Sequence, residues 1–215
     1  MKIVFRATVA MFALATLVLG LSLSWLYFYS GDLPDFAAVA SFAPDSTATA
    51  VDRCSTSSVR VISYDYLGRD LQNATRAAEG DSVEVFAVQI SRGLFCGSHT
   101  KELERHLLEY KASVQLRRKF TFEQLLTIYL NQAYFGHDLV GAENASLHYY
   151  GKHASELDIP QAAMVAGLIR APSIYSPETH PDRAKLRRDA VVGAMLARGA
   201  ITAEEAKAAV QASVR

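Results

Sequence analysis

The hydrophobic and polar positions divide this chain into two parts. Residues 7–29 carry no charged side chain, whereas the rest of the chain alternates short apolar runs with polar ones. At about 1.5 Å of rise per residue, a helix of this length can cross the roughly 30 Å hydrocarbon core of a bilayer. Lys2 and Arg6 precede the stretch, and a basic flank is retained in the cytoplasm. The pattern predicts one transmembrane helix, with the chain that follows it outside the cytoplasm.

A cleaved signal peptide is the alternative interpretation of the same stretch. Such a peptide has an apolar region of about 7–15 residues followed by a small-x-small cleavage site. The stretch here is longer, and Trp25-Leu26-Tyr27 is a poor cleavage context. The sequence therefore favours an uncleaved anchor with aromatic side chains at its outer end.

Helical patterning extends from residue 73 almost to the end of the chain. In a capping box, an N-cap side chain and a Glu or Gln three residues later satisfy two backbone amides, and Thr121 and Thr202 both begin such a motif. Ser155 with Asp158 is a similar start, and Gly and Pro residues supply the stops. Together these signals predict the following helices: near 100–118, 121–133, 138–149, 155–170, 181–198 and 202–213.

The segment between the apolar stretch and the helices has a different pattern. Residues 31–58 are rich in Ala, Ser, Thr, Asp and Pro without a clear period, which is typical of a stalk. In residues 59–71 β-favouring side chains alternate and a glycine follows, so a short strand or hairpin is predicted there. The chain is therefore expected to contain an anchor (1–30), a stalk with a β lead-in (31–72) and a mainly α-helical domain (73–215).

The charge balance differs between these parts. The 215 residues include 22 basic and 22 acidic side chains, so the net charge is zero. Residues 1–30 hold two of the bases and no acid, which leaves a net charge of −2 on the exported part. A dedicated nucleic-acid-binding protein usually carries a marked basic excess, so no nucleic-acid partner is expected. No Cys/His spacing resembles a zinc site, and no metal ligand is predicted.

The two cysteines, Cys54 and Cys96, both lie in the exported part. Thiols outside the cytoplasm tend to pair, so a disulfide is predicted between the stalk and the helical body. Two unpaired thiols, one of them buried, are the alternative. Two cysteines are too few for a disulfide-based scaffold.

One run of residues in the helical part has a sequence pattern that core packing alone does not explain. Residues 125–136, LLTIYLNQAYFG, resemble the "ILELYLN…FG" signature of the peptidoglycan glycosyltransferases, glycosyltransferase family 51. The segments that resemble later motifs of that family follow in the same order: GAENA with YYGK (141–152), LDIPQAAMVAGL (157–168), APS with YSP (171–177), RR with VV and M (187–195) and GAIT (199–202). The joint match, over about residues 93–209, is specific although no single segment is. It implies a mainly α, lysozyme-like fold.

The resemblance also implies which residues act on the substrate. Ala77-Ala78-Glu79 looks like the family's "AxED", which makes Glu79 the expected general base, although Gly80 stands in place of the aspartate. Residues 105–109 are similar to "RKxxE", so Glu109 is expected to line the catalytic site and help to hold the substrate. The expected substrate-binding residues are Gln89, Arg92, Arg105, Arg118 and Asn131, with Arg105 and Arg118 as candidate partners of a diphosphate.

Some of these assignments have plainer alternatives. Arg105 and Glu109 lie at i and i+4, where an ordinary intrahelical ion pair is common. The basic run that contains Arg118 could instead be a solvated helix end, because positively charged side chains interact favourably with the helix dipole there.

The match to the family is also incomplete upstream of residue 93. Only nine residues separate Glu79 from Gln89, where the family has several tens, including its "FxxHxG" and Gly-Gly-Ser-Thr elements.

The resemblance implies an inverting glycosyltransferase that polymerises lipid II into the glycan strands of the cell wall. It would be a single-pass protein of the bacterial inner membrane, with a cytoplasmic N-terminus and a periplasmic or extracellular C-terminal domain. Its expected partners are lipid II, nascent glycan strands and the membrane, with cell-wall synthases as further candidates. No cofactor is assigned, and a divalent cation is left open. Because of the missing segment, a second interpretation stands beside the enzyme: an impaired relative that binds lipid II or a synthase as a scaffold.

Overall fold

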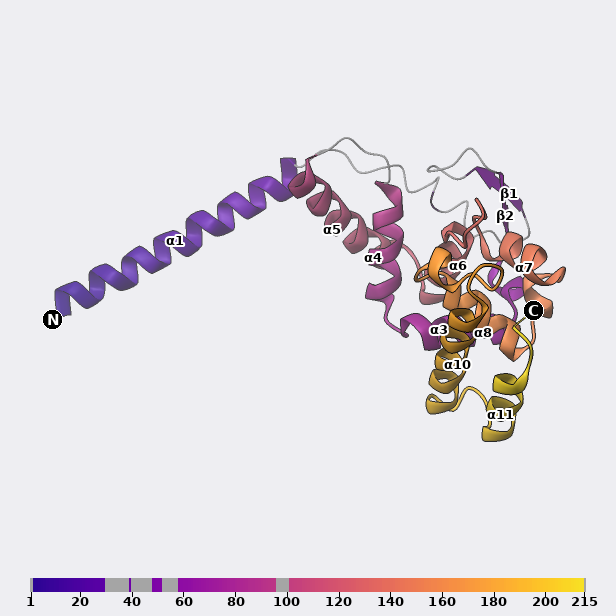
Figure 1. Ribbon diagram of the computed structural model, residues 1–215. Coiled ribbons are helices and arrows are strands. Elements are labelled where there is room, and N and C mark those ends of the chain that lie inside the picture. The colour runs from indigo at the N-terminus through magenta and orange to yellow at the C-terminus, as the bar shows by residue number, and fades with distance from the viewer. Residues whose placement is uncertain (1, 30–38, 40–47, 52–57, 96–100, 215) are drawn as a thin grey trace.

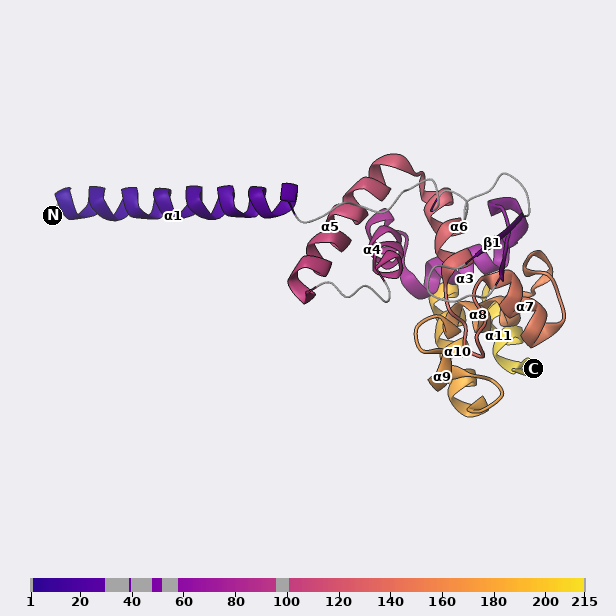
Figure 2. The same ribbon diagram turned by 90° about the horizontal axis from the view of Figure 1, so that it is seen from above.

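The first helix stands apart from the rest of the molecule. The computed structural model describes residues 2–29, 39, 48–51, 58–95 and 101–214. Helix α1 (Lys2–Tyr29) extends away from the helical body in both views (Figures 1 and 2), and its side chains from residue 11 to 24 are all exposed. Within the described ranges, no helix combines the length and the apolarity that a membrane span requires.

The remaining structure is mainly α-helical, as the sequence predicts, with one small sheet. Strands β1 (Ala48–Val51) and β2 (Ser58–Val61) pair antiparallel, with Ala48 opposite Val61. The helical elements follow in this order: η1 (Tyr64–Leu67), α3 (Arg69–Glu79), α4 (Val83–Leu94), α5 (Glu102–Lys119), α6 (Phe122–Gln132), α7 (Ala142–Tyr150), η2 (Ala154–Glu156), α8 (Ile159–Leu168), α9 (Pro172–Tyr175), α10 (Pro181–Ala197) and α11 (Ala203–Gln211).

The β element differs from its prediction. The hairpin partner of β2 precedes it, in the segment predicted as a stalk, and no strand continues to residue 71. The predicted glycine turn is instead the N-cap of α3, where Gly68 has φ +72°. A Cβ added there would lie 2.9 Å from the Cα of Ser155, so this glycine also permits close contact with the segment around η2. Helix α3 therefore begins at Arg69, before the predicted start at residue 73.

Gly68→Ala should lower the free energy of unfolding by about 2–4 kcal/mol. The left-handed backbone disfavours any Cβ, and the new methyl group would meet backbone atoms that cannot rotate away. Urea denaturation followed by circular dichroism measures the change. Gly193→Ala is the matched control, because a Cβ at this helical glycine meets nothing within 4 Å. We expect the control to be neutral or slightly stabilising, and equal effects of the two substitutions would contradict the assignment.

Most predicted helices are confirmed, with corrections at two starts. Thr121 and Thr202 each form the predicted capping box with the Gln or Glu three residues later. The predicted helix 155–170 starts too early, because Asp158 forms a capping box with Gln161 and opens α8 at that point. The predicted helix 138–149 begins only at Ala142, after a loop in which His137 and Asp138 have positive φ.

Helix α8 is the centre of the helical body. Every residue from Ala162 to Leu168 is buried, and α3 and α10 both pack against this helix (Figure 1). A second group consists of α4 with α5 and α6, where Phe86 of α4 is buried between the rings of Phe122 and Tyr129. Helix α3 belongs to the first group and α4 to the second, so the corner between α3 and α4 joins the two groups.

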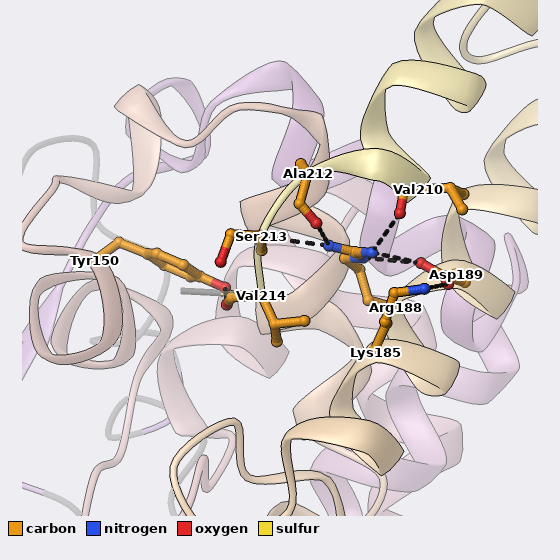
Figure 3. A network of polar contacts seen from close by, with 8 residues as sticks. All are labelled: Tyr150, Lys185, Arg188, Asp189, Val210, Ala212, Ser213 and Val214. Carbon is orange, nitrogen blue, oxygen red and sulfur yellow. Dashed lines mark hydrogen bonds and ion pairs between the residues drawn. The ribbon is translucent and has the colours of Figure 1, made fainter.

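A buried arginine ties the end of the described chain to this body. The Arg188 side chain on α10 is fully buried, and its guanidinium donates to the backbone carbonyls of Val210 and Ala212 near the end of α11 (Figure 3). Asp189 accepts from the same guanidinium at 2.8 and 2.9 Å. The Tyr150 hydroxyl donates to the carbonyl of Val214 at 3.1 Å. The second arginine of the RR motif therefore has a structural function.

Candidate active site

The predicted general base, Glu79, lies at the corner between α3 and α4. It is the last residue of α3, and Gly80, with φ +105°, closes the helix by donating its N–H to the carbonyl of Arg76 at 2.9 Å. Ser82 then caps α4 through its hydroxyl oxygen, which accepts from the amide of Glu84. The two helices are therefore joined by only three residues, and Glu79 is held by a helix on one side and a tight turn on the other.

The carboxyl group of Glu79 is unusually placed for an acidic side chain. Its Oε1 atom is buried and has no hydrogen-bond partner. Burial raises the pKa of Glu79 above its usual range, and the positive charges of Arg187 and Arg170 counteract part of this increase. Such a carboxyl group holds its proton more strongly than an exposed one, so it is a better base once ionised. A raised pKa in a half-buried acid is typical of functional sites, although structural networks also produce it.

Three further residues surround Glu79, each from a different part of the fold. Tyr129 of α6 is buried, and burial raises its pKa, with the charge of Glu79 adding to the effect. Arg187 of α10 donates through Nε to the carbonyl of Gly167 at 3.3 Å. Arg170 follows α8 and is exposed. We call Glu79, Tyr129, Arg170 and Arg187 the Glu79 cluster.

Sequence reasoning missed three of the four members of the Glu79 cluster as site residues. Tyr129 and Arg187 both lie inside quoted motifs, YLN and RR, so the signal was present but carried no assigned role. Arg170 precedes the APS motif and gave no signal of its own. Their proximity to Glu79 depends on the packing of α3, α6, α8 and α10, which no local pattern reveals.

The short connection between α3 and α4 is fixed by ion pairs. Asp81 accepts from Nε of Arg76 at 2.6 Å and also pairs with Arg198 just after α10. On α4, Glu84 pairs with Arg117 of α5 at 3.2 Å. These pairs are partly exposed, so each contributes little alone. Together they join the corner to α10 and α5.

Glu109 and Arg105 form the ion pair that their spacing allows. Nε of Arg105 lies 3.8 Å from Oε1 of Glu109 on the same helix, and the Glu109 side chain is 15% exposed. No hydrogen bond or ion pair within the described ranges links Glu109 to Glu79, and the charges that act on Glu79 belong to Arg187 and Arg170. The structure gives Glu109 its partner on α5, and the role of Glu109 in the site stays a prediction.

The other predicted substrate-binding residues lie mostly on the α4–α5 pair. Gln89 is half-buried on α4, and Arg92 is exposed in the last turn of the same helix. Arg118 is exposed in the last turn of α5, as expected for a solvated helix end. These positions are compatible with a ligand that lies along α4 and α5.

Asn131 occupies a structural position instead of the predicted substrate-binding one. Its side chain is fully buried, its Nδ2 donates to the carbonyl of Ile62 at 2.8 Å, and its Oδ1 accepts from the amide of Ile62 at 3.2 Å. An asparagine amide that replaces a strand partner in this way satisfies a backbone that burial would otherwise leave unpaired. Asn131 therefore ties the chain after β2 to α6.

Two further predictions concern cysteines and metals. Cys54 and Cys96 lie outside the described residues, so the predicted disulfide stays a prediction. In the part of the chain that the structure describes, no group of three or more His, Cys, Asp or Glu side chains could hold a metal ion.

This chain is similar in sequence to known proteins. The family model described as Transglycosylase matches residues 60–196. Penicillin-binding protein 1F of Bacillus subtilis (strain 168) is 36% identical over 151 residues, which cover 66% of this chain and 21% of the relative. Penicillin-binding protein 1A of Aquifex aeolicus (strain VF5) is 37% identical over 137 residues, which cover 64% of this chain and 18% of the relative. The crystal structure of Penicillin-Binding Protein 1A from Haemophilus influenzae aligns with a TM-score of 0.40 and 26% identity, over 60% of this chain and 16% of that one.

The matched region contains the site described above. This chain spans about a fifth of the length of the curated relatives it matches. The family model nevertheless covers more than half of this chain, and all four members of the Glu79 cluster lie within it. The motifs quoted from residue 105 to residue 195 lie within it as well. The chain therefore belongs to the transglycosylase family, glycosyltransferase family 51.

Proposed function

We propose that this protein is a peptidoglycan glycosyltransferase that polymerises lipid II, with Glu79 as the general base. The observation that carries the proposal is the Glu79 carboxyl group, which has a buried, unpartnered oxygen and lies near two cationic side chains. A base needs an oxygen that no protein group already occupies, and a pKa brought closer to neutral. An unpartnered oxygen on a carboxyl with a raised pKa supplies both.

The proposed reaction inverts one anomeric carbon. Glu79 accepts the proton of the 4-hydroxyl of one lipid II, and that oxygen forms a bond to the anomeric carbon of the growing glycan. The bond from this carbon to the undecaprenyl diphosphate breaks, and the diphosphate leaves with the electron pair. Arg105 and Arg118 are the proposed partners of the diphosphate, whose developing charge they would stabilise. Glu109 would hold Arg105 in place through the ion pair on α5.

We also propose that α1 anchors the protein in the bacterial inner membrane. The support is the uncharged stretch 7–29, the basic residues before it and the exposed apolar side chains along α1. The N-terminus would be cytoplasmic, and the helical domain, with its proposed lysozyme-like arrangement, periplasmic or extracellular. An anchor suits a lipid-linked substrate, because it raises the local concentration of enzyme at the membrane surface.

A scaffold is the second candidate function, and one observation favours it. Glu79 and α4 are joined by three residues, fixed by the Asp81 ion pairs, where the family has a long segment that includes its Gly-Gly-Ser-Thr element. A relative without this segment would keep a binding site for lipid II or a cell-wall synthase and lose turnover.

Fluorescently labelled lipid II, incubated with the full chain in detergent, distinguishes the two functions. We expect glycan polymer on gel electrophoresis, and parallel reactions with a chelator decide whether a divalent cation is needed. Binding of lipid II without any polymer would overturn the enzyme and support the scaffold. Absence of both binding and polymer would contradict both functions.

A further inference from the structure

Two buried side-chain polar atoms in the described part of the chain have no hydrogen-bond partner, and both belong to the Glu79 cluster. They are Oε1 of Glu79 and Nη2 of Arg187. Leaving a buried polar group unsatisfied is destabilising, and leaving a charged group unsatisfied is more so. The two atoms are also electrostatically coupled, since Arg187 exerts the largest of the favourable charge effects on Glu79. A carboxylate and a guanidinium in contact would normally bond to each other, and these two form no such bond.

The position of Arg187 explains why they do not. Its Nε donates to the carbonyl of Gly167 at 3.3 Å, and its guanidinium carbon lies 5.9 Å from the centre of the Tyr175 ring. The stem of the side chain lies against Gly167, where an added Cβ would be only 3.0 Å from Cγ of Arg187. These contacts hold the guanidinium on the α8 and α9 side of the cluster. Within the described ranges, no direct ion pair joins it to Glu79, and Nη2 of Arg187 and Oε1 of Glu79 are both without a partner.

The chemistry of the two atoms selects the kind of group that could bind to both. Glu79 Oε1 accepts a hydrogen bond, and Arg187 Nη2 donates one. A phosphate would suit Arg187, but its negative charge would be repelled by the carboxylate of Glu79. A neutral hydroxyl donates to one atom and accepts from the other, so it satisfies both at once.

We infer that Arg187 is a second substrate-contacting residue, which binds the acceptor 4-hydroxyl together with Glu79. Arg187 Nη2 donates to the hydroxyl oxygen while Glu79 Oε1 accepts the hydroxyl proton. As the proton moves to Glu79, the oxygen gains negative charge, forms its bond to the anomeric carbon, and the diphosphate departs with the electrons of the broken bond. The guanidinium stabilises that charge as it develops, which lowers the barrier. The inference rests on the proposed function, because it assigns a second residue to the same site.

Turnover kinetics of the full chain in detergent give the first test. Arg187→Gln should lower kcat for lipid II polymerisation about 100-fold, whereas KM should change much less. Arg187→Lys keeps the charge and part of the stem, so it should recover part of the loss. Arg183→Gln is the matched control, an exposed arginine one turn earlier on α10, and should leave turnover unchanged. Wild-type turnover by a folded Arg187→Gln variant would overturn the inference.

Binding to two lipid II probes tests the inference without turnover. One probe is lipid II, and the other is the same molecule with its acceptor sugar lacking the 4-hydroxyl. Arg187→Gln should weaken binding of the first about tenfold and leave binding of the second unchanged. Equal weakening of both probes would show a general structural effect and overturn the inference, and so would a wild-type chain that binds neither. Selective weakening in a chain that makes no polymer would overturn the proposed function and keep the Arg187 assignment.

Discussion

Glu79→Gln should abolish lipid II polymerisation, with a loss of about 100- to 10,000-fold in rate. Glutamine has the same shape as glutamate but cannot accept the hydroxyl proton, so the loss isolates the base. The measurement is the rate of polymer formation from labelled lipid II by the full chain in detergent. Glu204→Gln on α11 is the control, because it removes an exposed glutamate far from the site along the chain. A Glu79→Gln variant that polymerises at the wild-type rate would remove Glu79 from the mechanism.

The pH dependence of the rate follows from the same carboxyl group. Burial raises the pKa of Glu79, and only the ionised form is a base. The acid limb of the pH–rate profile should therefore lie at higher pH than an exposed glutamate would give. An acid limb at or below the usual pKa of a glutamate would contradict this assignment.

Stability should depend on pH in the opposite sense to activity. The pKa of Glu79 is raised in the folded state, so the stabilisation linked to its proton is complete below the unfolded pKa. This stabilisation is lost as the pH rises through the folded pKa. Relative to Glu79→Gln, the wild type should lose stability from about pH 4 toward neutrality. Thermal melting at several pH values measures the difference, and parallel curves for the two proteins would contradict it.

The helices were predictable from the sequence because their signals are local. A capping box joins residues three apart, so Thr121 and Thr202 mark helix starts without reference to the rest of the fold. The same reasoning misplaced the start of α8, because Ser155 and Asp158 offer competing starts and only the latter forms a box. Local patterns therefore predict which segments are helical more reliably than where each helix begins.

The site was only partly predictable, because it is built from contacts between distant segments. Glu79 was found through its motif, but the unpartnered oxygen and the proximity of Arg187 depend on how α3 and α10 pack on α8. Asn131 illustrates the opposite error. It lies in the YLN motif, yet its amide binds the backbone of Ile62, 69 residues away. A motif match identifies a position that the fold uses, and the structure decides whether the use is chemical or architectural.

Arg188 is the sequence neighbour of Arg187, but the fold gives it a structural role. Its substitution should therefore have a large effect on stability. The Arg188 side chain is fully buried, with carbonyls of the α11 end and the Asp189 carboxylate around its guanidinium (Figure 3). A helix leaves its last carbonyls without partners, and a cation there also suits the helix dipole. Arg188→Met would leave those carbonyls without their donor and would remove the partner of Oδ1 of Asp189, which keeps only Lys185 among the described residues. We expect the free energy of unfolding to fall by about 3–5 kcal/mol.

Substitutions of the two arginines of the RR motif should therefore have different effects: a loss of turnover for Arg187 and a loss of stability for Arg188. Urea denaturation of Arg188→Met, followed by circular dichroism, gives the loss of stability. Lys185→Met is the control, because Lys185 pairs with the same Asp189 at 3.3 Å from an exposed position and should contribute at most about 1 kcal/mol. Arg188→Lys keeps the charge but loses the planar fork that reaches several acceptors, so it should fall between the two. An Arg188→Met variant within about 1 kcal/mol of the wild type would mean that water or a rearranged α11 satisfies these carbonyls, and the structural assignment of Arg188 would fail.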